Sequence, residues 1–368
     1  MDELRLVLAG DVMTGRGVDQ VLPSPGAPNL HERHVRDART YVALAERASG
    51  PIAAPVDPTW PWGDALRDAD GFDPAVRVMN LETSVTRSDD AVPAKAVHYR
   101  MNPGNLDVLR VARVDVWALA NNHVLDYGIT GLHDTLDTLH AAGLRTAGAG
   151  RDEAEAWRPA VATSVTGHRV VVASVADGSS GVPEGWDATA SRPGIALLPD
   201  LADATADSVV QRVLESSRPG DTRVISVHWG GNWGYGVPRA QRRFAHRLVD
   251  GGVDVVHGHS SHHPRPIEVY RGRLVLYGCG DLVNDYEGIG GFEDYRAELR
   301  LLYLARLAAG TGRLLELRMI PLRARRLSLE RAGAADAGWL ARALEEAGRG
   351  LGTRVTLGAD ACLEVAQR

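Results

Sequence analysis

Residues 253–263 of the chain, VDVVHGHSSHH, form a short β-branched apolar run that is followed at once by four histidines within seven residues. A run of this length that gives way to glycine and polar residues is typical of a buried β-strand. Four imidazoles without partners would be costly to bury, so packing in a core does not explain the cluster. We therefore interpret the end of this strand as part of a functional site.

Four other predicted strands, residues 4–9, 76–79, 114–120 and 224–227, also end in polar residues. The residues that follow them are Asp11, Asn80, Glu82, Asn121, Asn122, His123, Asp126 and His228. Each of these alone has a simpler explanation as a turn former, a helix cap or a satisfied core residue. Because the carboxyl ends of strands in an open α/β sheet converge on one crevice, five such ends together favour a site.

Strand and helix patterns alternate along the chain, which favours a layered α/β fold. Apolar residues at helical spacing predict helices over residues 129–139 and 240–249, and the run 170–175 predicts a further strand. Residues 267–270 and 274–277 flank a tight turn and are predicted to pair as a hairpin. The sheets are therefore expected to be mixed.

We expect residues 1–325 to form one domain. Within it, the proline-rich segment 23–64 is interpreted as an insertion or lid over the strand ends, with a helical stretch near residues 31–48. The Ala-, Arg- and Leu-rich residues 326–368 are expected to form a helical C-terminal extension.

Composition excludes several classes of function. The 368 residues carry a net charge of −6 with no basic stripe, so nucleic-acid binding is not expected. No apolar run reaches the roughly 18 residues that a membrane span needs, and the chain enters its first strand without a secretion signal. We therefore expect a cytoplasmic protein with no membrane partner, and the oligomeric state is not indicated.

Cysteine and lysine are both rare. Cys279 and Cys362 form neither a disulfide framework nor a pattern of zinc ligands. Lys95 is the only lysine among 41 lysine and arginine residues, which we interpret as the codon bias of a GC-rich genome.

Ordered motifs connect these features over residues 4–305. They are Gly10-Asp11-Val12-Met13, Trp62-Gly63-Asp64, Asn80-Leu81-Glu82-Thr83, His98-Tyr99-Arg100-Met101, Asn121-Asn122-His123 with Asp126, His228-Trp229-Gly230, Gly258-His259 with His262, and Gly278-Cys279-Gly280-Asp281. As an ordered set they resemble the CapA family, named for poly-γ-glutamate capsule synthesis, within the calcineurin-like metallophosphoesterase superfamily. The resemblance implies a calcineurin-like fold, in which mixed β-sheets are layered with flanking helices.

The departures from the superfamily pattern affect the expected metal. Met13 and Ser261 stand where histidine ligands are usual, and the second motif offers Asn80 and Glu82 instead of a bridging aspartate. Oxygen ligands are thereby kept while nitrogen ligands are lost, which favours one hard divalent cation. We expect Ca²⁺, with Mn²⁺, Mg²⁺ or Zn²⁺ as alternatives. The expected metal ligands are Asp11, Glu82, Asn122, His228 and His259.

Imidazoles beside carboxylates suit proton transfer, because an unperturbed imidazole titrates near neutrality. His123 with Asp126 is one expected catalytic pair, and Asp11 with His259 or His262 is another. Two such pairs on opposite sides of a carbon atom can remove a proton from one face and return one to the other.

The CapA resemblance also implies a function. A lasso-peptide epimerase of this family inverts the Cα of a precursor's C-terminal tryptophan with His/Asp pairs around a calcium site. We therefore predict a metal-dependent isomerase, a peptide epimerase, with a peptide substrate. The alternatives are a metal-dependent hydrolase of a phosphoester or an amide, and a non-catalytic assembly factor for poly-γ-glutamate.

Overall fold

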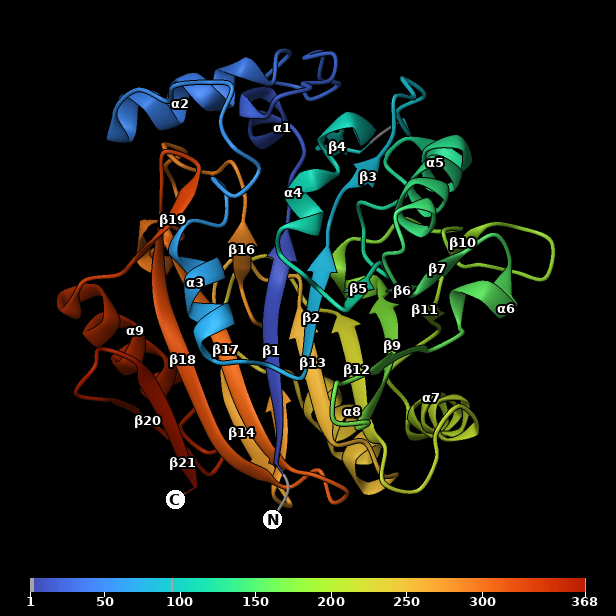
Figure 1. Ribbon diagram of the computed structural model, residues 1–368. Helices are drawn as coiled ribbons and strands as arrows, with labels where there is room; N and C mark the ends of the chain where they lie inside the picture. The colour runs from blue at the N-terminus through green and yellow to red at the C-terminus, as the bar shows by residue number, and fades with distance from the viewer. Residues whose placement is uncertain (1–2, 94, 368) are drawn as a thin grey trace.

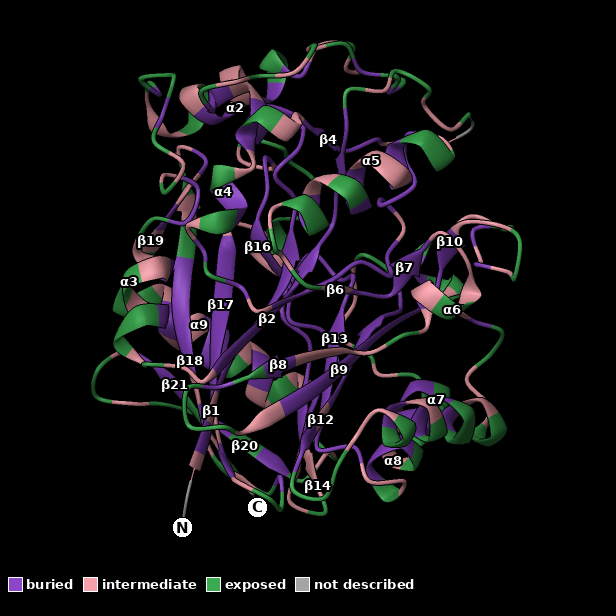
Figure 2. Ribbon diagram, turned by 45° about the vertical axis from the view of Figure 1, so that its right-hand side comes forward, coloured by how far each residue is buried: buried purple, intermediate pink, exposed green. Residues whose placement is uncertain are grey.

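Two β-sheets lie face to face, and helices cover the outer face of each (Figures 1 and 2). The computed structural model describes residues 3–93 and 95–367. Apolar side chains of both sheets, such as Leu6, Val172 and Val224, pack together in the core between them. The predicted α/β class is confirmed, and these layered mixed sheets with flanking helices form the calcineurin-like fold.

The first sheet is mixed, because β1 runs parallel to β2 and β16 but antiparallel to β17. Its strands are, in spatial order, β20 (Thr353–Leu357), β21 (Leu363–Gln367), β18 (Leu314–Arg325), β17 (Leu299–Ala308), β1 (Glu3–Val12), β2 (Val76–Leu81), β5 (Val116–Ala118) and β6 (Thr146–Ala147), with β16 (Asp281–Val283) beside β1 and β19 (Ser328–Arg331) beside β18.

The second sheet has a parallel centre with an antiparallel strand on each side. Its order is β11 (Leu197–Leu198), β9 (Arg169–Asp177), β12 (Thr222–His228), β13 (Val255–His259), β15 (Arg273–Leu276) and β14 (Ile267–Tyr270), with β8 (Ala160–Thr163) beside β9. The predicted hairpin of β14 and β15 is confirmed. Two short pairs, β3 (Ser84–Val85) with β4 (Arg100–Met101) and β7 (Ala149–Gly150) with β10 (Gly194–Ile195), lie outside both sheets.

Amphipathic helices cover the outer faces. Leu132 and Leu136 bury one side of α5 against the first sheet, and Val213 and Phe244 do the same for α7 and α8 on the second. Figure 2 shows the opposite sides of α7 and α8 exposed to solvent. The principal covering helices are α3 (Asp64–Gly71), α4 (Asp107–Arg110) and α5 (Gly128–Ala141) on the first sheet, and α7 (Asp203–Glu215) and α8 (Arg239–Asp250) on the second; α6 (Glu153–Ala156) lies near β7.

The proline-rich segment lies beyond the carboxyl ends of the strands, together with α1 (Gly17–Val21) and α2 (Arg39–Ser49) at the top of Figure 1. Arg16, directly after β1, attaches it to the rest of the molecule. The Arg16 guanidinium donates to Glu32 at 2.8 Å and to the Tyr41 hydroxyl at 3.1 Å, and it also donates to both carboxylate oxygens of Asp285. Because all these groups are buried, the segment is fixed next to the strand ends.

The expectation of a helical C-terminal extension is wrong for much of that region. Only α9 (Ala334–Ala347) is helical, while β19, β20 and β21 extend the first sheet. The edge of β18 is free to pair with them, and Leu344 and Leu363 complete the core between the sheets. Residues 326–367 are therefore a structural part of the first sheet.

No helix in the described part of the chain is long and apolar enough to cross a membrane.

Gly10 lies where β1 and the loop before β16 approach most closely. A Cβ atom at this position would lie 1.8 Å from the Gly280 carbonyl oxygen, and Asp11 donates its backbone N–H to that same oxygen. We expect Gly10→Ala to lower the free energy of unfolding by about 1–3 kcal/mol or more, as overpacking does. Chemical denaturation measures the change.

The matched control is Gly71→Ala at the end of α3, where an added Cβ meets nothing within 4 Å. This change is expected to leave stability unchanged or raise it slightly, by up to about 1 kcal/mol. Equal stability of both variants would contradict the close approach at Gly10.

Candidate metal centre and active site

Strand register places the polar residues of the site side by side. Asp11 on β1 pairs in register with Asp281 on β16 and with Asn80 on β2, and the pairing with β2 is irregular around Gly10. On the second sheet, His228 at the end of β12 pairs in register with His259 at the end of β13. Residues in register on neighbouring strands point to the same face, so each sheet presents a row of polar side chains at its carboxyl end.

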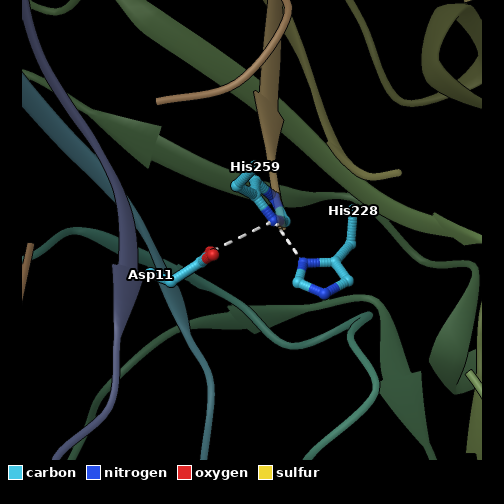
Figure 3. A group of neighbouring side chains, drawn as sticks. All are labelled: Asp11, His228 and His259. Carbon is cyan, nitrogen blue, oxygen red and sulfur yellow. Dashed lines mark hydrogen bonds and ion pairs between the residues drawn. The ribbon is translucent and has the colours of Figure 1, made fainter. Parts of the chain in front are cut away.

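Asp11, His228 and His259 come together between the two rows, where potential ligand atoms from all three lie within 4.8 Å of one another (Figure 3). Asp11 Oδ1 is 3.6 Å from His259 Nδ1, which is 2.8 Å from His228 Nδ1. The Ser260 backbone, held at a positive φ of 103°, donates its N–H to the other Asp11 oxygen. Such strain persists where surrounding structure fixes it, often at functional sites.

The other two expected ligands adjoin this group. Glu82 Oε2 lies 3.9 Å and Asn122 Oδ1 3.0 Å from nitrogens of His228. Asn80 donates its amide N–H groups to Asp11 at 2.7 Å and to Glu82 at 3.1 Å, which fixes both carboxylates. The five residues predicted as metal ligands are therefore neighbours, and their role as ligands remains a prediction.

The electrostatics of this group fit a bound cation. Burial, with the nearby charge of Asp281, raises the pKa of Asp11 to about 7. Burial and Asp11 raise the pKa of Glu82 well above its usual value. Burial, together with neighbouring histidines, lowers the pKa values of His228 and His259 so that both remain neutral. A divalent cation would offset the crowding of the carboxylates and accept the free imidazole lone pairs.

From the sequence, His262 is expected to pair with Asp11, but in the structure its carboxylate partner is Asp281. Its Nδ1 lies 3.0 Å from Asp281 Oδ1, whereas Asp11 contributes only a longer-range attraction. Asn284 donates to the second Asp281 oxygen at 2.6 Å and so fixes the carboxylate. The reason is the pairing of β16 with β1, which places a second aspartate next to Asp11. Asp11, His262 and Asp281 also form a second group with potential ligand atoms within 4.8 Å of one another.

His123 and Asp126 form the other His–carboxylate pair, as expected, with Nδ1 and Oδ2 2.6 Å apart. The Tyr99 backbone N–H donates to the same Asp126 oxygen. Lys95 binds the other Asp126 oxygen and the Asn122 carbonyl oxygen through its Nζ, which lies 3.3 Å from His123 Nδ1. Three donors thus fix Asp126 behind the imidazole.

Both pairs face one cavity of about 380 Å³, which we call the reaction cavity. Its lining includes Glu82, Lys95, Asn122, His123, Ser260, His262 and Tyr286. Tyr99 packs edge-on against His123, Tyr286 packs edge-on against His262, and the Tyr99 hydroxyl donates to the Tyr286 hydroxyl at 2.7 Å. The two tyrosines therefore fix the spacing between the two imidazoles.

The two imidazoles carry different charges. Burial lowers the pKa of His123 to about 4, even though Asp126 opposes the shift. Burial also acts on His262, but the charge and hydrogen bond of Asp281 outweigh it and raise the pKa above its usual value. Near pH 6, His123 is neutral while His262 is largely protonated, so one can accept a proton while the other donates one.

Three residues of the site had no role assigned from the sequence. Asp281 follows Gly280 as Asp11 follows Gly10, and this repeated Gly-Asp pair was an available signal. Lys95 was attributed to codon bias, yet the chain's only lysine lies in the reaction cavity. Tyr286 had no sequence signal, because only the folded chain brings it to His262.

The fold and the site define an α/β protein with a candidate divalent-metal centre at the carboxyl ends of two layered sheets. The chain belongs to the PGA_cap family of bacterial capsule synthesis proteins, whose profile matches residues 5–286.

Several named proteins are similar to the chain. A "Probable polyglutamine synthesis accessory protein" of Mycobacterium tuberculosis is 51% identical over 99% of this chain and 96% of its own length. The "PGA biosynthesis protein CapA" of Bacillus subtilis is 28% identical over 77% of this chain and 64% of its own length. The solved structure of TT1561 from Thermus thermophilus aligns at 10% identity with a TM-score of 0.38, over 85% of this chain and all of that one.

Removing divalent cations is expected to make the stability of the protein depend on pH around the pKa of Asp11. A carboxyl with a raised pKa in the folded state stabilises fully below its unfolded pKa and loses that effect as pH rises through the folded pKa, here about 7. The Tm of chelator-treated protein, taken at each pH as its difference from the Tm of Asp11→Asn, should therefore fall between about pH 4 and pH 7, because the comparison cancels the opposite contribution of the buried histidines. Differential scanning fluorimetry measures this fall.

Adding Ca²⁺, Mn²⁺, Mg²⁺ or Zn²⁺ should restore the Tm most strongly at pH 8, where cation and proton no longer compete. Asp11→Asn should abolish the restoration by cations. A Tm that is independent of pH and of every cation would contradict a metal centre at Asp11.

The reactivity of Lys95 tests its ion pair with Asp126 in the wall of the reaction cavity. Its side chain is 11% exposed and bonded to Asp126, so we expect an amine-acetylating reagent to modify it at least roughly tenfold more slowly than a free amine. Mass spectrometry after peptide digestion gives the rate of acetylation. The control is Lys95→Arg, which has no lysine side chain and so gives the background of acetylation at other groups. Acetylation as fast as that of a free amine would show that Lys95 is not bound to Asp126.

Proposed function

We propose that this protein is a divalent-metal-dependent enzyme that inverts an amino-acid Cα in a peptide-like chain. The observation that carries the proposal is the geometry of His123 and His262. Each imidazole is oriented by its own carboxylate, and both face the same cavity.

Inversion of a Cα needs a base on one side of the carbon and an acid on the other. His123 would take the Cα proton, and the electron pair of the C–H bond would move toward the adjacent carbonyl oxygen. Protonated His262 would then donate its proton to the opposite face and regenerate the carbonyl. Reversal of the two roles converts the product back, so the reaction needs no oxidant and no second substrate.

The metal centre would supply electrostatic stabilisation to the negative charge that develops on the carbonyl oxygen. Asp11, Glu82, Asn122, His228 and His259 would hold the cation. The hydrogen bonds from Asn80 orient two of these ligands, and the oriented carboxylates need not reorganise during the reaction.

The relatives direct the choice of substrate. Their names concern polyglutamine synthesis and PGA biosynthesis, which supports a polymer of glutamate or glutamine residues over the lasso-peptide precursor expected from the sequence. A glutamyl polymer and a peptide share the reacting group, a Cα–H bond next to a C=O carbon, which belongs to a free carboxylate in a γ-linked polymer and to an amide in a peptide. We therefore propose a chain of amide-linked amino acids as the substrate class.

A metal-dependent hydrolase is the second candidate. Asp11 belongs to both groups of potential metal ligands, and a carboxylate between two cations is a feature of hydrolytic two-metal sites. A non-catalytic accessory role is the third candidate, and the name of the mycobacterial relative supports it.

Deuterium exchange separates the three candidates. The protein with added cation is incubated in D₂O with γ-linked and with α-linked oligo-L-glutamate, and the products are analysed by mass and by chiral amino-acid analysis. Epimerisation adds one deuterium per inverted residue and leaves the chain length unchanged. Shortened chains would favour the hydrolase, and binding without any change in the polymer would favour the accessory role.

Single-histidine variants test the two-base geometry. His123→Gln and His262→Gln should each lower the rate of inversion by roughly 10²–10⁴-fold. Each variant keeps one base, so each should still exchange the Cα proton of only one epimer, and the two variants should retain opposite epimers. His140→Gln, on the exposed surface, is the control. Full inversion by either site variant would overturn the proposal.

A further inference from the structure

A chain of three adjoining cavities leads away from the reacting histidines. The reaction cavity shares His262 and Tyr286 with a second cavity of about 230 Å³, here called the aromatic cavity, which Trp233 and Phe292 also line. The aromatic cavity shares Tyr286, Phe292 and Ile289 with a third cavity of about 230 Å³. We call the third one the anchor cavity. Tyr286 therefore lines all three cavities, and the anchor cavity adjoins the site of the histidines through the aromatic cavity.

Arg300 lines the anchor cavity and lacks a partner for its charge. The residue is 1% exposed, and its Nη1 donates only to the backbone carbonyl oxygens of Ala297 and Leu299. Its buried Nε has no hydrogen-bond partner, and no carboxylate of the described residues lies within ion-pair distance. Arg16, which is equally buried, is by contrast paired with Glu32 and Asp285. A buried guanidinium without an anion is costly.

Glu287, in the same cavity, has an acceptor atom that lacks a hydrogen-bond donor. Its Oε2 accepts the Leu327 backbone N–H at 3.1 Å, while its Oε1 is buried and has no hydrogen-bond partner. Glu287 and Arg300 do not form an ion pair with each other among the described contacts, although both line the cavity. The cavity thus offers one unsatisfied charged donor and one unsatisfied charged acceptor.

The other charged groups of the cavity are already bonded. Glu298 binds Arg296 at 2.6 Å, and Glu293 accepts the Gly291 backbone N–H at 2.8 Å. Arg323 binds Asp336 at 3.4 Å. Only Arg300 and Glu287 therefore have atoms that need a ligand.

We infer that the anchor cavity binds an N-acylated α-amino carboxylate. The carboxylate would accept from Arg300 Nε, and the adjacent amide N–H would donate to Glu287 Oε1. The flanking Ile289 and Phe292 are 40% and 38% exposed and would cover the apolar part of the same residue. The inference rests on the proposed function for its view of the ligand as part of the substrate chain.

Two sources supply this chemistry. The last residue of an α-linked peptide carries a free carboxylate next to an amide N–H. Each residue of a γ-linked glutamyl polymer carries the same pair, because its α-carboxylate is not used in the chain. The two sources differ in whether the ligand must end at the anchor cavity.

Binding measurements test the site without requiring turnover. Isothermal titration calorimetry compares N-acetyl-L-alanyl-L-phenylalanine with its C-terminal amide, and both with γ-linked penta-L-glutamate, on the full chain with added cation. We expect the free acid to bind at least tenfold more tightly than the amide. Tighter binding of the γ-linked probe assigns the site to the polymer, and tighter binding of the dipeptide assigns it to a peptide end.

Variants identify the two groups. Arg300→Gln should remove the preference for acid over amide, and Arg300→Lys should retain part of it if the glutamine variant fails to fold. Glu287→Leu, which removes the acceptor oxygen, should remove the preference for the dipeptide over its analogue with a methylated amide nitrogen. Arg158→Gln, an exposed arginine beside a cavity elsewhere, is the matched control.

Equal affinity of the wild type for acid and amide would overturn the inference. So would an Arg300→Gln variant that weakens both probes equally, because Arg300 would then act through its attraction to Asp281. The double variant His123→Gln/His262→Gln separates the two proposals. Acid-selective binding by that variant supports the anchor site even if the wild type exchanges no deuterium.

Discussion

The site depends on two like charges that strand pairing places side by side. Asp11 and Asp281 are in register on β1 and β16, and Glu82 lies close behind them. Three buried carboxylates would repel one another, so positive charge must gather around them. The charge of Asp281 raises the pKa of His262 and so favours its protonated form. The neutral imidazoles of His228 and His259 can donate lone pairs to a cation beside the carboxylates.

The two layered sheets contribute different kinds of side chain to the site. The first sheet supplies carboxylates and amides from Asp11, Asn80 and Asp281, while the second supplies His228 and His259. The loops after β5 and β13 then carry His123 and His262 to the wall of the reaction cavity. The hydrogen-bonded pair of Tyr99 and Tyr286 holds these loops at a fixed spacing. The proposed acid–base groups and the expected metal ligands therefore lie in one hydrogen-bonded framework.

Much of this arrangement could be predicted from the sequence, because buried strands are apolar and end abruptly. Asp11 and His259 lie at the ends of such strands, and His123 with Asp126 follows another. The partner of His262 could not be predicted, because β16 is only three residues long and joins β1 through tertiary pairing. The strands after residue 326 were also missed, since the Ala-, Arg- and Leu-rich composition favours a helix and only tertiary pairing at the edge of β18 selects strands.

The pairing of Asp11 with Asp281 joins positions that are far apart in the chain. During synthesis the ribosome delivers Asp11 early, whereas β16 emerges only after most of the chain has been made. Asp11 therefore cannot pair with Asp281 while the first part of the chain is being made. The two carboxylates come close together only after β16 has been synthesised and has paired with β1. If a cation binds at Asp11 as we propose, a truncated chain that ends before β16 would lack Asp281 and with it the crowding of carboxylates that favours the cation.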